Sequence, residues 1–231
     1  MYGAIKEITG SCTSLVSSGV TVADVGTDHG YIPIYLVESG KNKCAIAMDI
    51  NRGPLDRAEA HIRMHGLGEQ IKTRLSDGVK KLQIGECDCV IVSGMGGGLV
   101  IKIMEDGEEI FRNLKEFILQ PQSEIAKVRQ YLCEHNYRII AEDMVLEDGK
   151  FYPMMKVANG SAEEYSTLEL RYGKLLLREK HPVLKLFLEK EEKTKEQICR
   201  QLRKEEGIHI ASRIAELENE IAQTKEALGI Y

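Results

Sequence analysis

The chain has 231 residues, of which 43% are hydrophobic and 29% are charged, and it carries a formal net charge of −5 at pH 7. This length suits one full-sized domain with a smaller appendage. The acidic balance excludes a uniformly basic protein that coats nucleic acid, and no segment approaches the roughly 20 apolar residues that cross a bilayer.

Short apolar segments alternate with longer amphipathic segments through residues 1–160. We expect strands at residues 22–26, 44–49, 71–75, 87–92 and 117–119, and helices at residues 31–39, 54–64, 99–104 and 123–134. This alternation predicts an α/β fold with a mostly parallel sheet that is covered on both faces. Two further segments, 137–145 and 151–157, flank an Asp148-Gly149 turn and predict a terminal antiparallel hairpin. A parallel sheet with such an ending is typical of class I methyltransferases and their Rossmann-like fold.

Helix-forming residues dominate from residue 161 onward. Pro182 is suited to begin a long helix, and Gly207 is expected to break it. Heptad-spaced positions on both sides of the break predict a coiled-coil hairpin, which could pair within one chain or between two. These positions are Leu184, Phe187, Glu191, Thr194, Ile198 and Gln201, then Ile210, Ile214, Leu217, Ile221, Thr224 and Leu228. We therefore expect a catalytic domain at residues 1–160 and a helical hairpin at residues 161–231.

The charge is unevenly distributed along this second domain. Residues 171–204 contain eleven Lys and Arg against five Glu, whereas the rest of the chain is acidic. A basic helix face could bind the phosphates of a nucleic acid, although most such faces are merely solvated.

The segment Asp24-Val25-Gly26-Thr27-Asp28-His29-Gly30 follows the first strand and precedes a helix. Ligands bind at this switch point of a doubly wound sheet, and Gly26 allows a close approach to the backbone. The dinucleotide fingerprint G-x-G-x-x-G is absent, and two acidic residues would repel a pyrophosphate. Such a loop suits a ligand with a cationic centre, such as a sulfonium; the simpler alternative is a turn with capping residues.

Acidic or glycine residues also follow three later strands and could contact a ligand there. Asp49 could accept hydrogen bonds from a ribose diol, or could only cap the next helix. Asp77 and Gly78 could contact an adenine amine, or could form a plain turn. The run Ser93-Gly94-Met95-Gly96-Gly97-Gly98 lacks the Lys-Ser/Thr of a P-loop and suits a flat base beside a reacting group.

These residues resemble the bacterial TrmK-type tRNA (adenine(22)-N1)-methyltransferases. The resemblance lies in the segments 23–33, 92–97 and 118–122 and in the run from Asp143 to Gly149-Lys150-Phe151-Tyr152, and it covers nearly the whole chain. It implies methyl transfer from S-adenosylmethionine to N1 of an adenine in the tRNA D-loop. It also implies that the Asn/Asp-Pro-Pro-Tyr motif of amino-group methyltransferases is missing, as it is here.

The reaction that this resemblance implies needs alignment more than a strong base, because adenine N1 already has a lone pair. We expect Asp28 to contact the adenine amine, with His29 and Tyr31 shaping the pocket. Two other readings stay open: a methyltransferase of small molecules, and a non-catalytic RNA-binding or scaffold protein.

The sequence also allows expectations about metal binding, cellular location and oligomeric state. The six cysteines lack metal-site spacing and predict reduced, buried side chains, so we expect no metal. The first 20 residues lack a secretory signal, so we expect a cytoplasmic location without membrane attachment. The protein is expected to be a monomer or a weak dimer.

Overall fold

The computed structural model describes residues 7–161, 163–204 and 208–231. The chain divides into two compact units, residues 1–164 and 165–231. The break expected at Gly207, and the first six residues of the segment considered for a secretory signal, lie outside the described residues.

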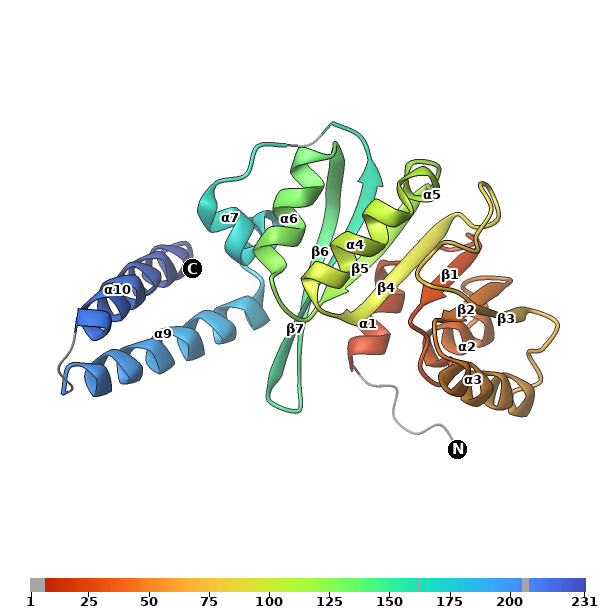
Figure 1. Ribbon diagram of the computed structural model, residues 1–231, viewed down its shortest axis with the longest axis horizontal. Coiled ribbons are helices and arrows are strands. Elements are labelled where there is room, and N and C mark those ends of the chain that lie inside the picture. Colours follow the sequence, from red (N-terminus) through yellow and green to blue (C-terminus); the bar gives the residue numbers. More distant parts are fainter. Residues whose placement is uncertain (1–6, 162, 205–207) are drawn as a thin grey trace. The chain divides into compact units, whose positions relative to one another are not determined.

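The first unit contains one mixed sheet and six helices among its described residues (Figure 1). In chain order these elements are α1 (Glu7–Leu15), β1 (Val22–Val25), α2 (Tyr31–Glu38), β2 (Ala45–Asp49), α3 (Arg52–Met64), β3 (Ile71–Leu75), β4 (Cys89–Met95), α4 (Gly97–Asp106), α5 (Glu108–Arg112), β5 (Glu116–Pro121), α6 (Ile125–Glu134), β6 (Tyr137–Glu147) and β7 (Lys150–Asn159).

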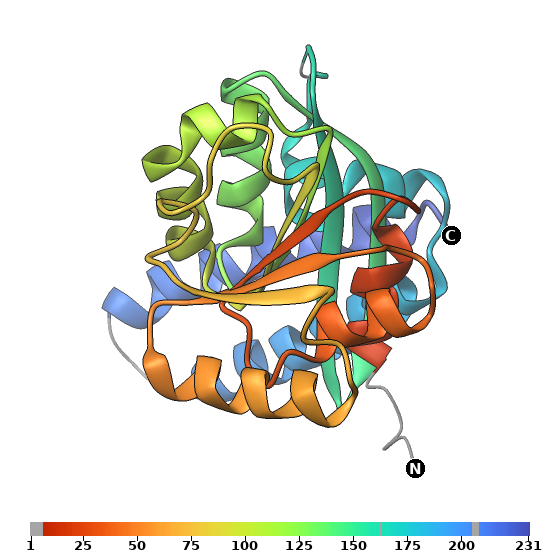
Figure 2. The same ribbon diagram turned by 90° about the vertical axis from the view of Figure 1, so that its right-hand side faces the viewer.

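The strand order of the sheet is β3-β2-β1-β4-β5-β7-β6. The first five of these strands are parallel, and β7 runs antiparallel to both β5 and β6. Because the connections from β1 and from β4 run in opposite directions across the sheet, their helices cover opposite faces (Figure 2). The α/β fold with a terminal antiparallel hairpin is thus confirmed.

The terminal hairpin turns at the predicted residues. Glu147 pairs with Lys150, which leaves Asp148 and Gly149 as a two-residue loop. Both loop residues have positive φ angles, 50° and 74°, as a type I′ turn requires. The Asp-Gly sequence therefore fixes the register of the last two strands.

Helix α1 was not predicted from the sequence, because Thr9, Gly10, Ser11 and Thr13 are typical of loops. Contacts with the rest of the unit hold it in place. Lys41 Nζ donates to the carbonyl oxygens of Thr13 and Ser14 at 2.7 and 2.9 Å, and Ser11 Oγ donates to Asp143 on β6. These contacts satisfy groups at the end of the helix that would otherwise lack partners.

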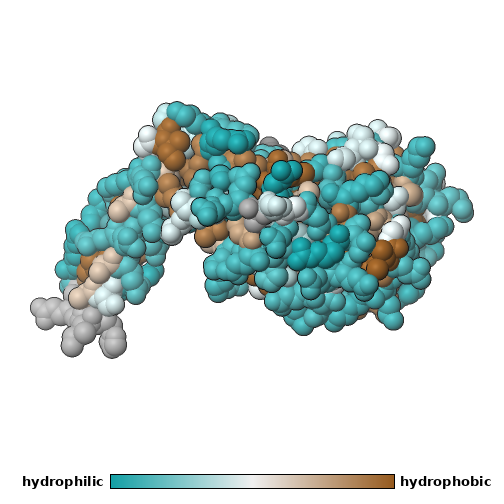
Figure 3. Space-filling view, turned by 90° about the horizontal axis from the view of Figure 1, so that it is seen from above, coloured by the Kyte–Doolittle hydropathy of each residue, from teal (hydrophilic) through white to brown (hydrophobic). Residues whose placement is uncertain are grey.

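The second unit is helical and comprises α7 (Thr167–Tyr172), α8 (Lys174–Arg178), α9 (Pro182–Leu202) and α10 (Ile208–Leu228). A capping box between Ser166 and Glu169 begins α7, and Pro182 lies in the first turn of α9, as predicted. Ion pairs join Arg203 to Glu218 and Lys225 to Glu196, so α9 and α10 are antiparallel. The face of this unit seen at the left of Figure 3 is mainly hydrophilic.

On α10 the predicted positions Leu217 and Thr224 are buried, and so is Ala227, which was not predicted. On α9 the heptad positions predicted to face the partner helix are wrong in the C-terminal half of the helix, where Thr194 and Gln201 are exposed. The buried residues there are Lys195 and Cys199. Polar contacts explain why Lys195 is buried on this helix. Glu191 accepts hydrogen bonds from Tyr172 and Thr224 and forms an ion pair with Lys195 at 2.9 Å.

Candidate functional site

The segments singled out from the sequence meet at the carboxyl edge of the sheet in the first unit. Strands β3, β2, β1 and β4 are parallel neighbours, so the loops that follow them lie side by side. The backbone N–H groups of Gly26 and Thr27 both donate to the Met48 carbonyl at 2.8 Å, and Ser76 N–H donates to the Asp49 carbonyl at the same distance. These bonds join the loops after three strands into one surface.

The loop after β1 contains three residues with positive φ, of which only His29 carries a side chain that disfavours this conformation. Gly26, His29 and Gly30 have φ angles of 78°, 61° and 72°, all in the left-handed region. The side chain of Met95, the last residue of β4, lies over Gly26, and a Cβ there would clash with its Cε. Gly26 therefore provides the bare backbone that the sequence analysis expected, with a flexible side chain above it.

Two carboxylates give this edge a negative potential. Asp24 is 4% exposed. Burial raises the pKa of its carboxyl to about 6, the polar Thr27 side chain lowers it, and the charge of Asp49 raises it further. Asp49 is held in place because its Oδ1 accepts from the Asn51 N–H at 2.7 Å. A buried carboxylate beside a second one is stabilised by a bound cation.

The three residues expected to act in catalysis lie together at the mouth of this loop. Asp28 is exposed and forms an ion pair with Arg57 of α3 at 2.9 Å. The rings of His29 and Tyr31 are stacked, with centroids 5.4 Å apart, and Tyr31 is 58% exposed. Arg57 was not predicted as a site residue, because an arginine in an amphipathic helix carries no signal of its distant partner.

The loop after β3 contains Asp77 and Gly78. Asp77 is exposed and forms an ion pair with Lys80 at 2.5 Å. Lys80 also contacts Asp106 of α4 at 3.0 Å. Gly78 has a φ of 55° and packs against Ile103, 3.2 Å from where a Cβ would lie. Asp77 thus has a partner that a ligand would have to share or displace.

The glycine-rich segment at the end of β4 is held by Gln120, which lies in the segment 118–122 of the resemblance but was not predicted as a site residue. Gln120, at the end of β5, is 1% exposed. Its Oε1 accepts from Gly94 N–H at 2.9 Å and from Ser93 Oγ at 3.2 Å. Gly94 has a φ of 79° and lies at a register shift between β4 and β5. Gln120 thereby fixes the backbone of Ser93 and Gly94.

The beginning of α4 packs closely against the loop that follows β5. A Cβ on Gly97 would lie 2.5 Å from the Ser123 carbonyl oxygen, which is backbone and cannot move aside easily. Gly96 precedes this helix without a side chain. The backbone of the glycine-rich loop is therefore exposed on one side and anchored on the other.

The donor set of this edge fits S-adenosylmethionine. Asp24 and Asp49 offer negative charge to a cation, Gly26 and Gly94 offer bare backbone, and Asp49 Oδ2 makes no hydrogen bond within the described residues. No group of His, Cys, Asp and Glu suited to a metal ion occurs in the described parts of the chain. Burial raises the pKa of the Cys12 thiol, beside Ser93, to about 12, so this thiol is protonated at neutral pH.

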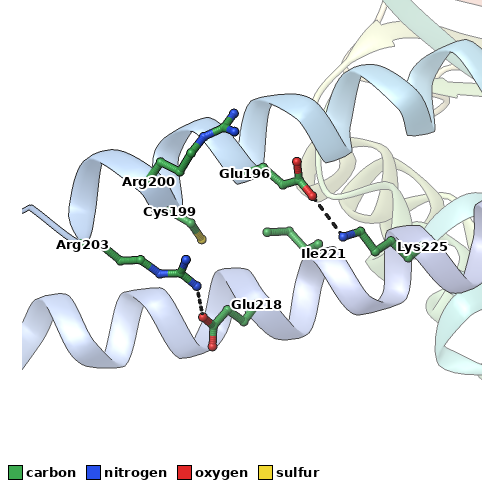
Figure 4. A pocket seen from close by; sticks show the side chains of 7 residues that line it. All are labelled: Glu196, Cys199, Arg200, Arg203, Glu218, Ile221 and Lys225. Atoms are coloured by element: carbon green, nitrogen blue, oxygen red, sulfur yellow. Dashed lines mark hydrogen bonds and ion pairs between the residues drawn. The ribbon is translucent and has the colours of Figure 1, made fainter.

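The second unit contains a groove of about 320 Å³ between α9 and α10 (Figure 4). Ion pairs between Arg203 and Glu218, at 2.6 Å, and between Lys225 and Glu196, at 3.0 Å, span it. Its charged groups are mostly engaged with one another. We therefore assign no ligand to this groove.

The basic block of the second unit is only partly available to a ligand. Lys195 is 9% exposed and contacts Glu191 and Glu220. The prediction that it could contact phosphates is therefore wrong. Lys193 and Arg200 are exposed, and their spacing of seven residues places them on one face of α9, about 10 Å apart along its axis.

The chain is similar to proteins of one family. Residues 22–226 match the family described as tRNA (adenine(22)-N(1))-methyltransferase. The tRNA (adenine(22)-N(1))-methyltransferase of Bacillus subtilis strain 168 is 34% identical over 180 residues, which is 76% of this chain and 74% of that protein.

Solved structures of tRNA methyltransferases are also similar to this chain. A Streptococcus pneumoniae protein in complex with S-adenosyl-L-methionine is 32% identical, with a TM-score of 0.87 over 97% of this chain and 99% of that one. M. capricolum TrmK, in complex with the natural cofactor product S-adenosyl-homocysteine, is 26% identical, with a TM-score of 0.83 over 99% of each chain. No helix in the described ranges has the length and apolar character needed to cross a membrane.

Proposed function

Since this chain belongs to the tRNA (adenine(22)-N(1))-methyltransferase family, we propose that it transfers a methyl group from S-adenosylmethionine to N1 of adenine 22 in tRNA. The observation that carries this proposal is the buried carboxylate of Asp24, which lies beside Asp49 at a glycine-lined sheet edge. A ligand whose reactive centre is a cation would relieve the repulsion between these two groups.

Different residues at the sheet edge would bind different parts of the cofactor. Asp49 would accept hydrogen bonds from the ribose hydroxyls, and Asp77 and Gly78 would contact the adenine. Asp24, Gly26 and the backbone of Ser93 to Gly96 would surround the methionine part, and the Met95 side chain would have to move off Gly26. When bound, the cofactor supplies a methyl group that its sulfonium makes susceptible to displacement.

The protein need not remove a proton from the nucleophile, because adenine N1 carries a lone pair. Its task is to align N1 with the methyl group and to exclude water. Asp28 accepts a hydrogen bond from the adenine N6 amine and stabilises the positive charge that develops on the base. The stacked rings of His29 and Tyr31 border the base. His29 Nδ1 is buried and has no partner in the described residues.

The target adenine has to be unpaired or flipped out, because N1 is engaged in base pairing inside a duplex. The exposed face of α9 holds the tRNA backbone through Lys193 and Arg200, with Lys185 and Lys204 as further exposed cations on this helix and just after it. A tRNA substrate agrees with the cytoplasmic location expected from the sequence.

The test is incubation of the protein with labelled S-adenosylmethionine and a tRNA transcript, followed by nucleoside mass spectrometry. We expect 1-methyladenosine that co-elutes with an authentic standard, and none with a transcript in which adenine 22 is replaced by guanine. Methylation of both transcripts would place the target elsewhere. Methylation of neither, with S-adenosylmethionine still bound, would favour a small-molecule substrate.

A further inference from the structure

Three residues of α3 contact three consecutive residues of the loop that carries Asp28. Arg57 forms an ion pair with Asp28 at 2.9 Å. His61 Nδ1 lies 3.0 Å from the His29 carbonyl oxygen. Ala58 packs against Gly30, 3.4 Å from the position of a Cβ. Residues 57, 58 and 61 lie on one helix face, so α3 presents a continuous surface to the loop.

We propose that this face of α3 is a clamp, in which Arg57 and His61 are positioning residues that hold the loop of Asp28 and His29 in its reactive geometry. The proposal rests on the function proposed above, because it assigns these two residues to that reaction. Neither has to touch the substrate or the cofactor.

The backbone of the loop explains why a clamp is needed. His29 and Gly30 both adopt left-handed conformations, and a histidine populates this region sparingly. A carbonyl oxygen only accepts hydrogen bonds, so His61 Nδ1 carries the proton that it donates to His29. The two imidazole rings are also stacked, with centroids 5.2 Å apart. His61 thus restrains both the backbone and the side chain of His29.

Arg57 acts on the neighbouring residue. The Asp28 side chain is 64% exposed, so little else restricts its rotamers. The ion pair holds Asp28 Oδ1 on the side of α3, and Asp28 Oδ1 also lies 3.5 Å from His29 Nε2. Arg57 therefore sets the direction in which the carboxylate faces, which is the property that contact with a bound base requires.

The first readout of the test is the conformation of the loop, measured as hydrogen–deuterium exchange of residues 26–31 in the free protein. Arg57→Gln and His61→Ala should accelerate exchange in this loop. The matched control is Arg63→Gln, because Arg63 lies on the same helix and, among the described residues, pairs only with Glu59 of that helix. Unchanged exchange in both clamp variants, or equal acceleration in the control, would overturn the proposal.

The second readout is the kinetics of tRNA methylation. The clamp predicts that Arg57→Gln lowers kcat on the order of 10- to 100-fold, as expected for a misplaced reacting group, with an unchanged KM for S-adenosylmethionine. Arg57→Lys should restore part of kcat, because lysine can pair with Asp28. In an Asp28→Asn background, Arg57→Gln should have no further effect; an equal loss in both backgrounds would refute the coupling.

The two readouts separate the clamp from the reaction. If the wild-type protein methylates no tRNA, the proposed function fails, while the exchange experiment still decides whether α3 holds the loop. If the protein methylates tRNA and the exchange is unaffected by the variants, only the clamp fails.

Discussion

Replacement of Asp24 by asparagine should remove a pH dependence from cofactor binding. The pKa of the Asp24 carboxyl is about 6 in the free protein, mainly because it is buried, and also because Asp49 is close. A cationic ligand binds best when Asp24 is ionised. Asp24 is about 90% ionised at pH 7 and about 10% ionised at pH 5, so affinity should fall about tenfold over this interval, or about 1.4 kcal/mol.

The measurement is isothermal titration calorimetry of S-adenosylmethionine binding at intervals between pH 5 and pH 8. The wild-type affinity should rise with pH and level off above pH 7. Asp24→Asn should bind more weakly at pH 7.5 and lack the slope, so that the two proteins converge near pH 5. The control Asp56→Asn, an exposed partner of Arg52, should keep the slope. A slope that persists in Asp24→Asn would refute the reasoning and assign it to another group.

The same substitution should affect the stability of the free protein. The pKa of Asp24 in the folded state lies above its ordinary value of 3.8, so the folded state binds the proton more tightly than the unfolded state between these values. Its contribution to the free energy of unfolding therefore decreases as pH rises through about 6, by at most about 3 kcal/mol. Asp24→Asn should then unfold at a higher temperature than the wild type at pH 7.5 in the absence of ligand.

Four further variants test other residues of the site, the basic helix and the fold. Asp49→Ala should weaken S-adenosylmethionine binding by roughly 1–3 kcal/mol in calorimetry, because it removes charge-assisted hydrogen bonds; equal affinity would place the ribose elsewhere. Asp28→Asn should lower kcat about 100-fold with little change in cofactor affinity, and unchanged turnover would remove Asp28 from the reaction. Lys193→Glu combined with Arg200→Glu should weaken tRNA binding and reduce its salt slope by about two, whereas Lys43→Glu in the first unit should not. Gly97→Ala should lower the free energy of unfolding by about 1–3 kcal/mol, because its Cβ would meet the Ser123 carbonyl, while Gly98→Ala, where the nearest atom belongs to a flexible side chain, should cost far less.

The sequence predicted the features that depend on local patterns. Buried β-branched strands, the Asp148-Gly149 turn and Pro182 at the start of α9 each follow from the preferences of a few adjacent residues. Acidic and glycine residues directly after strands also predicted where Asp24, Gly26 and Asp49 would meet, because parallel strands bring their carboxyl ends to one edge.

The features that were missed depend on partners distant in the chain. Helix α1 has a loop-like composition and is held by Lys41 and Asp143. Gln120 bonds to Gly94, 26 residues away, and Arg57 to Asp28, 29 residues away. No local periodicity encodes these pairings.

The buried positions of α9 differ from the predicted heptad positions for another reason. The prediction assumed that the most regularly spaced positions face the partner helix. Lys195 instead turns inward, because its charge is compensated by Glu191 and by Glu220 of α10. A buried ion pair thus overrode the hydrophobic spacing.

The most direct test of the central claim is a crystal structure of the protein with S-adenosylmethionine bound. We predict that the ribose hydroxyls contact Asp49, that the methionine part lies between Gly26 and Gly94, and that Met95 has moved off Gly26. Density for the cofactor at any other place, or an unchanged Met95 over Gly26 at saturating cofactor, would contradict the account.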